Sequence, residues 1–342
     1  MAVTSSPSSS QSSTLAFAAL LGAGVAVGFS PILARLSDLA PLASGFYRLA
    51  FAFVAIWLAV RLSGSGVQSF TTMTPADRVR LGAVGFLNAR PLVHELDVLP
   101  RFELRYDPPS ECARLLHDGS IDVGMIPSIE YLRGGPYRIV PDVAIASNGP
   151  VASVALYTTK PLRDVRSIAM DTSSRTSVAL VQVLCARHFT IQPVLEQHGP
   201  DLTTMLARCD AALIIGDAAL LIDALQVQST KYEVEKIDLG ETWTAMTGLP
   251  FVYAFWAGRP GALDGADVAA LQRARDAGVT QPDLIAREYF ADSHEHQAIG
   301  ARYLRDNIKY HLRDEERAGL EMFYRYAAEA GVVPSAGQLE FY

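Results

Sequence analysis

Residues 166-RSIAMDTSSRTSVALVQVL-184 pass from a short apolar run to a polar turn and then to an amphipathic stretch. The pattern predicts a buried strand over 166–170, a hydroxyl-rich turn and a helix over 176–189. Ser and Thr are favoured at helix starts because their side-chain oxygens accept hydrogen bonds from the free N–H groups of the first turn. One hydroxyl is enough for this capping, so the further hydroxyls and Arg175 form a candidate anion site at the positive end of the helix. The alternative is a richly capped helix whose arginine faces solvent.

The sequence on both sides of this unit alternates between short apolar runs and amphipathic runs. This alternation favours β-α units and a largely parallel sheet. It predicts a first set of elements and then a second set. The first set comprises strands over 80–87, 102–107, 121–127 and 151–159 and a helix over 110–119. The second set adds to the opening unit a helix over 201–209 and strands over 210–216 and 250–258.

Two successive sets predict an α/β fold with two lobes, the second covering about residues 160–249. From Leu263 onward the sequence is mostly helical, and its clearest helix covers 314–331. Polar residues follow several of the expected strands, namely Asn88, Ser128, the cluster 171–177 and Asp217. Ligands of open α/β sheets bind at the carboxyl ends of the strands. These side chains are therefore expected to face one cleft.

The totals bound the kinds of partner. The chain has 342 residues and a formal net charge of −7, and an acidic chain without a basic block is not typical of a protein that binds nucleic acid. The cysteines Cys112, Cys185 and Cys209 form no C-x-x-C pair, so neither a disulfide framework nor a zinc site is predicted. In 294-HEH-296 the histidines are two residues apart, and in a helix such residues point to different faces. We therefore expect no metal and no cofactor.

The N-terminal part differs in composition from the rest. Residues 1–13 are Ser-rich and nearly uncharged, which is typical of a disordered tail. Two apolar runs follow within residues 14–62, 14-TLAFAALLGAGVAVGFSPILA-34 and 49-LAFAFVAIWLAV-60. They predict a hairpin of two membrane-spanning helices. A Ser/Gly/Thr-rich linker over 63–77 then leads to the domain 78–342. The alternatives for the apolar runs are a buried helical hairpin and a signal peptide.

The charges that flank these runs predict an orientation. Arg61, Arg78 and Arg80 follow the second run, whereas Arg35 in the short connection is balanced by Asp38. The positive-inside rule then places the downstream domain in the cytoplasm, tethered to the inner face of the membrane. The sequence does not predict an oligomeric state.

The apolar block also resembles a known family. The stretch 28-GFSPILARLSDLAPLASGFYRLAFAFVAIWL-58 is similar to the first two spans of drug/metabolite transporters of the EamA type. Those transporters use many spans, so the resemblance does not imply transport here. Three interpretations of the block stay open: an anchor, a fusion remnant, or a start site placed too far upstream.

A second resemblance covers roughly residues 78–342. The segments that carry it are 82-GAVGFLNARPL-92, 108-PPSECARLLHDGSIDVGMIPSIEYL-132, 138-RIVPDVAIASNGPVASVALYT-158, 168-IAMDTSSRTSVALVQVL-184, 213-LIIGDAAL-220 and 239-LGETWTAMTGLPFVYAFWAGR-259. Together they resemble the chorismate dehydratases of the futalosine route to menaquinone. The resemblance implies a two-lobed fold of the type II periplasmic binding protein kind. It also implies a hydro-lyase that removes water from chorismate and forms 3-[(1-carboxyvinyl)oxy]benzoate.

The resemblance implies roles for the polar residues. Asn88 and Ser153 are the expected catalytic residues, although Asn88 has the alternative role of an Asx cap. The two carboxylates of chorismate need donors held in a dry site. The expected substrate-binding residues are Ser128, Thr172, Ser173, Ser174, Arg175, Thr176, Ser177 and Asp217.

No side chain stands out as a general base. The family implies that the enolpyruvyl carboxylate of the substrate removes the proton, with Glu241 as the reserve candidate. Two other functions remain open. One is a solute-binding protein of the same fold, and the other is the sister enzyme that releases a dihydroxynaphthoate from a cyclised futalosine. The sister family depends on a histidine base, and no histidine falls at an expected cleft position.

Overall fold

The computed structural model describes residues 78–222 and 233–342. The chain divides into two compact units, residues 1–74 and 75–342, and the described residues belong to the second. The expected tail, membrane helices and linker, and the segment similar to EamA transporters, fall on residues 1–77 and lie outside the described part. Within the described part, no helix is both long enough and apolar enough to cross a bilayer.

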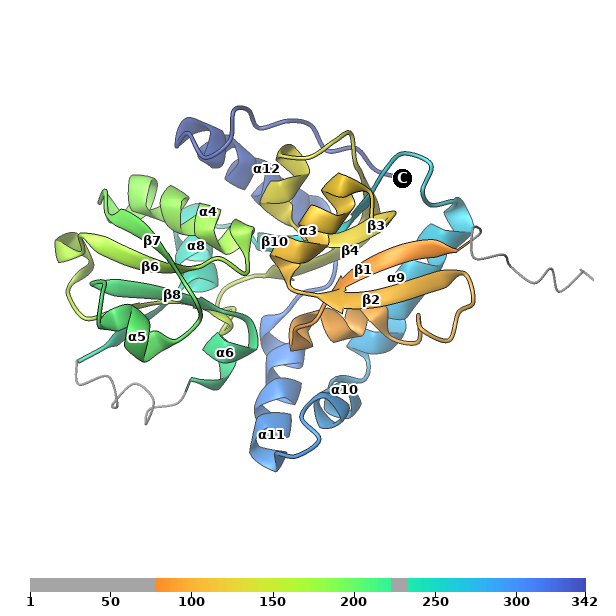
Figure 1. The fold of residues 1–342 in the computed structure, drawn as a ribbon, viewed down its shortest axis with the longest axis horizontal. Coiled ribbons are helices and arrows are strands. Elements are labelled where there is room, and N and C mark those ends of the chain that lie inside the picture. Colours follow the sequence, from red (N-terminus) through yellow and green to blue (C-terminus); the bar gives the residue numbers. More distant parts are fainter. Residues whose placement is uncertain (1–77, 223–232) are drawn as a thin grey trace, which may run out of the picture. The chain divides into compact units, whose positions relative to one another are not determined.

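Among the described residues, the first sheet has five strands in the order β2-β1-β3-β10-β4 (Figure 1). β1 (Val79–Val84) pairs in parallel with β2 (Phe102–Asp107) and with β3 (Val123–Pro127). β10 (Phe251–Gly258) runs antiparallel between β3 and β4 (Arg138–Ser147). We call the part of the chain built on this sheet the first lobe.

The second sheet repeats this plan in the order β7-β6-β8-β5-β9. β6 (Ser167–Asp171) pairs in parallel with β7 (Val194–His198) and with β8 (Ala211–Ile215). β5 (Val154–Thr158) runs antiparallel between β8 and β9 (Glu235–Asp238). We call residues 154–222 and 233–247 the second lobe. The chain thus crosses between the lobes twice, from β4 to β5 and from the end of the second lobe to β10.

Two strands lie in the sheet opposite to the one expected. The sequence pattern assigned 151–159 to the first set, but β5 belongs to the second sheet. It also assigned 250–258 to the second set, but β10 lies inside the first sheet. Both strands are buried along their whole length. Because an all-apolar strand fits the interior of either sheet, its composition does not specify its partners.

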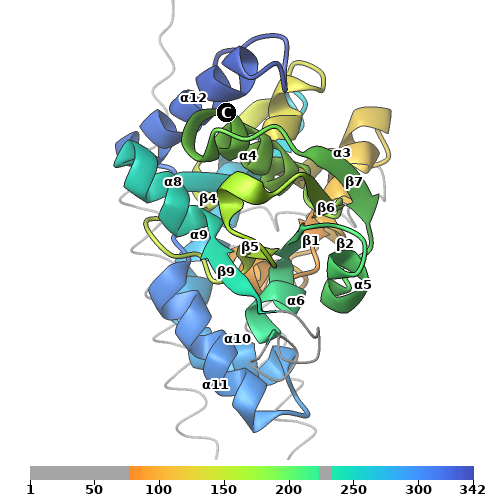
Figure 2. The same cartoon turned by 90° about the vertical axis from the view of Figure 1, so that its left-hand side faces the viewer.

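Helices pack on both sheets (Figures 1 and 2). In the first lobe they are α3 (Pro109–Asp118), α9 (Gly265–Val279), α10 (Pro282–Tyr289), α11 (His294–Arg302) and α12 (Asp314–Glu329). In the second lobe they are α4 (Arg175–Leu184), α5 (Leu202–Leu206), α6 (Gly216–Leu221) and α8 (Leu239–Thr247). α3 packs on β1 and β3, and α12 contacts both β10 and α4. α12 therefore joins the two lobes on one side of the molecule.

Local sequence explains where the helices near the site begin and end. α3 ends at Gly119, whose φ of 85° is the left-handed conformation that glycine adopts at helix ends. α4 begins at the N-cap Ser174, whose side chain accepts a hydrogen bond from Ser177 N. The expected helix 176–189 is α-helical only to Leu184 and continues as a π-helical turn over Cys185–Phe189.

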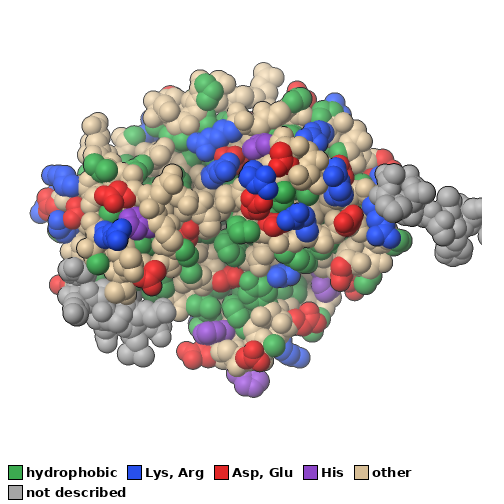
Figure 3. Space-filling model, in the orientation of Figure 1, with side chains coloured by type: hydrophobic (Ala, Val, Ile, Leu, Met, Phe, Trp, Pro, Cys, Tyr) green, Lys and Arg blue, Asp and Glu red, His purple; other side chains and the backbone are tan. Residues whose placement is uncertain are grey.

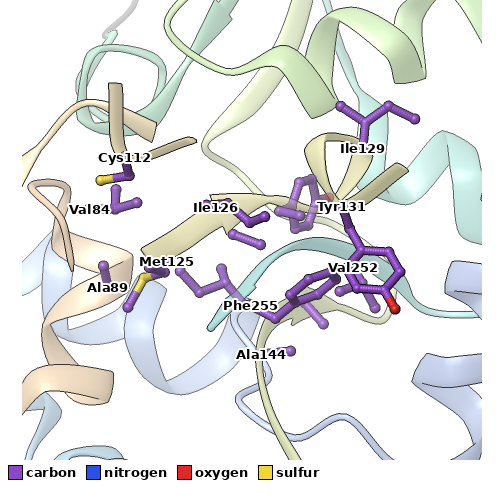
Figure 4. Packing of buried hydrophobic residues seen from close by; sticks show 14 of the residues in the cluster. Val84, Ala89, Cys112, Met125, Ile126, Ile129, Tyr131, Ala144, Val252 and Phe255 are labelled. Carbon is purple, nitrogen blue, oxygen red and sulfur yellow. The ribbon is translucent and has the colours of Figure 1, made fainter. Parts of the chain in front are cut away.

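The main hydrophobic core lies on the first sheet, beneath the helices that pack on it, and extends into the second lobe. Figure 4 shows Phe255 of β10 between its neighbours Ile126 of β3 and Ala144 of β4, with Met125 of β3 near Ala89. A smaller cluster lies where α5 packs on β8. All three cysteines are free and buried, which confirms that they form no disulfide.

Candidate active site

A cleft lies between the two lobes. Its apolar wall includes Phe86, Pro109, Pro127, Ile145, Ile215 and Tyr253. Its polar groups are the side chains of Asn88, Ser153, Ser174 and Ser177. A largely apolar hollow with a few converging polar groups is typical of a small-molecule site. Four of the residues predicted from the sequence therefore lie around one cavity.

The start of α4 supplies one side of the cleft. Ser174 and Ser177 both line it, and Ser177 Oγ donates to Ser174 Oγ at 3.2 Å. The first N–H groups of a helix have no partner within the helix, and the helix dipole makes this end positive. The arrangement suits an anionic group, such as a carboxylate, although neither serine carries a charge.

Asn88 supplies the opposite side. It lies inside the short helix η2 (Leu87–Val93), which has no side-chain cap, so Asn88 does not act as an Asx cap of that helix. Its Oδ1 is buried and has no hydrogen-bond partner among the described residues. A buried amide oxygen without a partner is costly in a folded protein. A ligand that donates a hydrogen bond would satisfy it.

Ser153 lies on the crossing from β4 to β5 and is 1% exposed. Asp238 holds this crossing, since its carboxylate accepts hydrogen bonds from Val151 N at 3.0 Å and from Ala152 N at 2.7 Å. These bonds support Ala152 in the left-handed region with φ of 63°. Ser153 Oγ accepts a hydrogen bond from Tyr303 Oη at 2.7 Å. Sequence reasoning missed Tyr303, because it lies in the C-terminal helical tail.

Gly216 brings α6 close to the cleft wall. It has a φ of 65°, and a Cβ added there would lie 3.0 Å from the ring of Phe86. Both features require glycine. The tight turn after β8 therefore lets the two lobes approach closely at this point.

The cleft is almost free of ionisable groups. Among the described residues that line it, only Tyr253 has an ionisable side chain, and burial raises its pKa well above the usual value. No His, Asp, Glu, Lys or Arg from the described part lines the cleft. A base for any proton transfer therefore has to come from elsewhere, and Glu241 is exposed and does not line the cleft.

Several predicted site residues bind protein groups between the lobes instead of facing the cleft. Ser128 Oγ donates to Val252 O at 2.8 Å and lies 3.3 Å from Thr176 Oγ1. Thr176 Oγ1 accepts a hydrogen bond from Ile129 N at 3.2 Å. Both side chains are fully buried. Their hydroxyls bind protein groups where α4 meets the helix η3 (Ser128–Leu132).

Arg175 forms an ion pair with Glu130 at 2.6 Å and does not line the cleft. Glu130 also binds Arg133 at 3.0 Å and His117 at 3.1 Å. Burial by itself raises the pKa of Glu130, but these hydrogen bonds and the charge of Arg175 hold it below the usual value. Arg175 thus makes a contact that joins the second lobe to the first, and its predicted contact with substrate stays a prediction.

Asp217 makes a second contact between the lobes. Its carboxylate accepts hydrogen bonds from Tyr289 Oη at 2.5 Å and from Leu87 N at 3.2 Å. Burial raises the pKa of Asp217 even though these hydrogen bonds lower it. It does not line the cleft, and its carboxylate joins the two lobes.

The remaining residues of the turn shape the backbone. Ser173 O accepts a hydrogen bond from Ser110 N of α3 at 3.1 Å. Asp171 accepts one from Ser173 N at 3.0 Å and so fixes the turn. Thr172 is exposed and does not line the cleft.

Outside the cleft, one cluster of ligand-type side chains comes together. Single atoms of Glu196, His198 and Cys209 lie within 4.8 Å of one another in the second lobe. Burial raises the pKa of the Cys209 thiol, and its hydrogen bond with Glu196 raises it further. These effects favour the protonated thiol. The face seen in Figure 3 shows basic and acidic side chains interspersed. On α3, Arg114 forms ion pairs with Glu111 and Asp118.

Comparison with known proteins gives a consistent result. Residues 79–329 match the protein family described as menaquinone biosynthesis. A chorismate dehydratase from Thermus thermophilus is 33% identical over 272 residues, which cover 75% of this chain and 96% of the relative.

Solved structures with low sequence identity share the fold. A protein from Archaeoglobus fulgidus superposes with a TM-score of 0.60 at 16% identity, covering 76% of this chain and 100% of that one. The periplasmic aliphatic sulphonate-binding protein from Escherichia coli superposes with a TM-score of 0.53 at 17% identity, covering 79% and 97%. The second likeness confirms the two-lobed, periplasmic-binding-protein type of fold and, at this identity, shows nothing about function.

Proposed function

Since the chain belongs to the menaquinone biosynthesis family, we propose that it is a hydro-lyase that converts chorismate to 3-[(1-carboxyvinyl)oxy]benzoate and water. This reaction is the first step of the futalosine route to menaquinone. The observation that carries the proposal is the cleft whose polar lining consists of uncharged hydroxyl and amide groups, in a chain 33% identical to a chorismate dehydratase.

The substrate requires donors for two carboxylates. We assign the start of α4, with Ser174 and Ser177, to one of them. The apolar wall of the cleft, which includes Phe86 and Ile145, suits the ring. Hydrogen bonds to a carboxylate are stronger in such a dry site than in water. The wall thus excludes water while the helix start holds the charge.

The reaction removes a proton from the ring carbon that bears the enolpyruvyl ether and a hydroxyl from the neighbouring carbon. The electrons of the C–H bond complete the aromatic ring as the C–O bond breaks, and the proton and the hydroxyl leave as water. Aromatisation supplies the driving force, so the protein mainly has to orient the ring and stabilise the developing charge.

Asn88 and Ser153 are assigned to the leaving hydroxyl. The unpartnered Asn88 Oδ1 accepts the hydrogen of that hydroxyl and orients it. The Ser153 hydroxyl, which already accepts from Tyr303, donates its own hydrogen to the oxygen as the C–O bond breaks. Because no carboxylate or histidine from the described residues lines the cleft, the enolpyruvyl carboxylate of the substrate is the proposed base.

The test is to incubate the full chain with chorismate and follow the ultraviolet spectrum. Loss of the diene absorption and growth of a benzoate band is the expected result. Binding of chorismate without a spectral change would support a solute-binding protein, since solute-binding proteins share this fold. Conversion of cyclised futalosine, with chorismate left intact, would favour the sister enzyme. The absence of histidine among the described lining residues weighs against this sister enzyme.

We also propose that the catalytic domain is cytoplasmic and tethered to the inner face of the membrane through residues 14–62. The support is the two apolar runs and the arginines that follow them. Membrane sedimentation of the full chain, compared with a chain that starts at residue 78, tests this proposal. Recovery of both chains in the soluble fraction would contradict it.

A further inference from the structure

Tyr303 lies behind the cleft and interacts with both residues assigned to the leaving hydroxyl. It begins the turn η6 (Tyr303–Asn307) after α11, and its side chain is 2% exposed. Its hydroxyl donates to Ser153 Oγ at 2.7 Å. Burial raises the pKa of Tyr303 more than the hydrogen bonds with Ser153 and Asn88 lower it. The hydroxyl therefore keeps its proton at neutral pH and acts as a donor.

Asn88 lies near the same hydroxyl, since its side chain lowers the pKa of Tyr303 slightly against the effect of burial. Its Oδ1 is buried and has no partner among the described residues, and Asn88 lines the cleft.

The hydrogen bond between Tyr303 and Ser153 has a defined direction, because the Tyr303 hydroxyl donates and Ser153 Oγ accepts. Because Ser153 Oγ already accepts this bond, its own hydrogen is free to point into the cleft. Successive bonds in one direction polarise each other, which makes the last hydroxyl a better donor.

We propose that Tyr303 is a positioning residue: its hydroxyl orients Ser153 as a donor towards the substrate hydroxyl. The inference rests on the dehydration proposed above. Tyr303 does not line the cleft, so it acts through Ser153. Nothing in the family match assigns it a role.

The backbone around Ser153 is held without the help of Tyr303. Asp238 binds Val151 N and Ala152 N, and Asn307 Nδ2 donates to Pro150 O at 2.9 Å. Removal of the Tyr303 hydroxyl therefore frees the Ser153 side chain but leaves the crossing in place.

The experiment compares Tyr303→Phe with Tyr310→Phe in the full chain. Tyr310 is a matched control, because it is also buried, lies close in sequence, and has a hydroxyl without a partner among the described residues. Tyr303→Phe is expected to lower kcat about 10- to 100-fold, as loss of an orienting partner does, with KM changed less than about twofold. Tyr310→Phe is expected to keep the kcat of the unmodified chain. A Tyr303→Phe chain with unchanged kcat would overturn the inference.

A second measurement separates positioning from a general loss of structure. If Tyr303 acts through Ser153, the Tyr303→Phe change in a Ser153→Ala background should lower kcat by clearly less than it does alone. A full multiplicative effect would overturn the proposed route. Failure of the unmodified chain to convert chorismate would refute the proposed function itself. Turnover by the unmodified chain with equal rates in Tyr303→Phe would refute only the role of Tyr303.

Discussion

Arg175 at the start of α4 donates to the Glu130 carboxylate across the two lobes at 2.6 Å. Glu130 is 1% exposed and also binds His117 and Arg133 from its own lobe. Arg175 is the member of this group that reaches from the second lobe. Because Glu130 keeps its other two partners, loss of Arg175 removes a contact between the lobes without leaving a buried charge unpaired.

Replacing Arg175 by Ala is expected to raise KM about fivefold and to leave kcat unchanged. Arg175 is partly exposed, so the ion pair contributes about 1 kcal/mol to holding the two lobes together around the cleft. Steady-state kinetics of Arg175→Ala and Arg114→Ala test this. Arg114 is a matched control, because its partners Glu111 and Asp118 lie on the same helix. An unaltered KM would show that the ion pair does not help to hold the two lobes together around the substrate.

The ion pairs of Glu130 predict a pH dependence of stability. Its pKa in the folded chain is lower than the ordinary value of 4.5. The stabilisation is therefore fully present above the pKa of the unfolded chain and is lost as pH falls through the folded value. The difference in the free energy of unfolding between the unmodified chain and Glu130→Gln should shrink between about pH 5.5 and about pH 3. Urea unfolding at several pH values measures it, and a constant difference would contradict the prediction.

Much of the fold could be predicted from local patterns. The strand over 166–170 and the capped helix after it depend on neighbouring residues, and both form as β6 and α4. The sheet partners of β5 and β10 could not be predicted, because the sequence of a fully buried, apolar strand does not specify which strand it pairs with. Pairing of such strands is decided by contacts far apart in sequence.

The site was predictable to the extent that its residues follow strands. Asn88 and Ser174 line the cleft as expected. A polar residue at a strand end, however, serves a contact between lobes equally well, as Ser128 and Asp217 do. Tyr303 could not be found, because its partner Ser153 is 150 residues earlier in the chain. Its pattern in the helical tail is that of an ordinary core residue.

Ser174 has two roles that a matched pair of substitutions can separate. It caps α4 and lines the cleft. Ser293 caps α11 in the same way, accepting from His296 N, but does not line the cleft. Both Ser→Ala changes are expected to cost about 1 kcal/mol of stability. Only Ser174→Ala should also raise KM for chorismate. Equal KM values in the two variants would argue against carboxylate binding at the start of α4.

Asn88→Ala is expected to reduce turnover far more than stability. The Oδ1 atom has no protein partner among the described residues, so loss of this oxygen breaks no hydrogen bond within the fold, and the amide nitrogen takes with it only its interaction with Tyr303. If that oxygen orients the leaving hydroxyl, its loss should lower kcat about 10²- to 10³-fold, as loss of a preorganised polar group does at other active sites. Tyr157→Phe is the control, because the Tyr157 hydroxyl is also buried without a partner among the described residues and does not line the cleft. Kinetics and thermal melting of both variants decide the matter. A rate in Asn88→Ala equal to that of the unmodified chain would remove Asn88 from the reaction. A large fall in melting temperature with a modest fall in kcat would mean instead that Asn88 serves chiefly to hold Tyr303 in place.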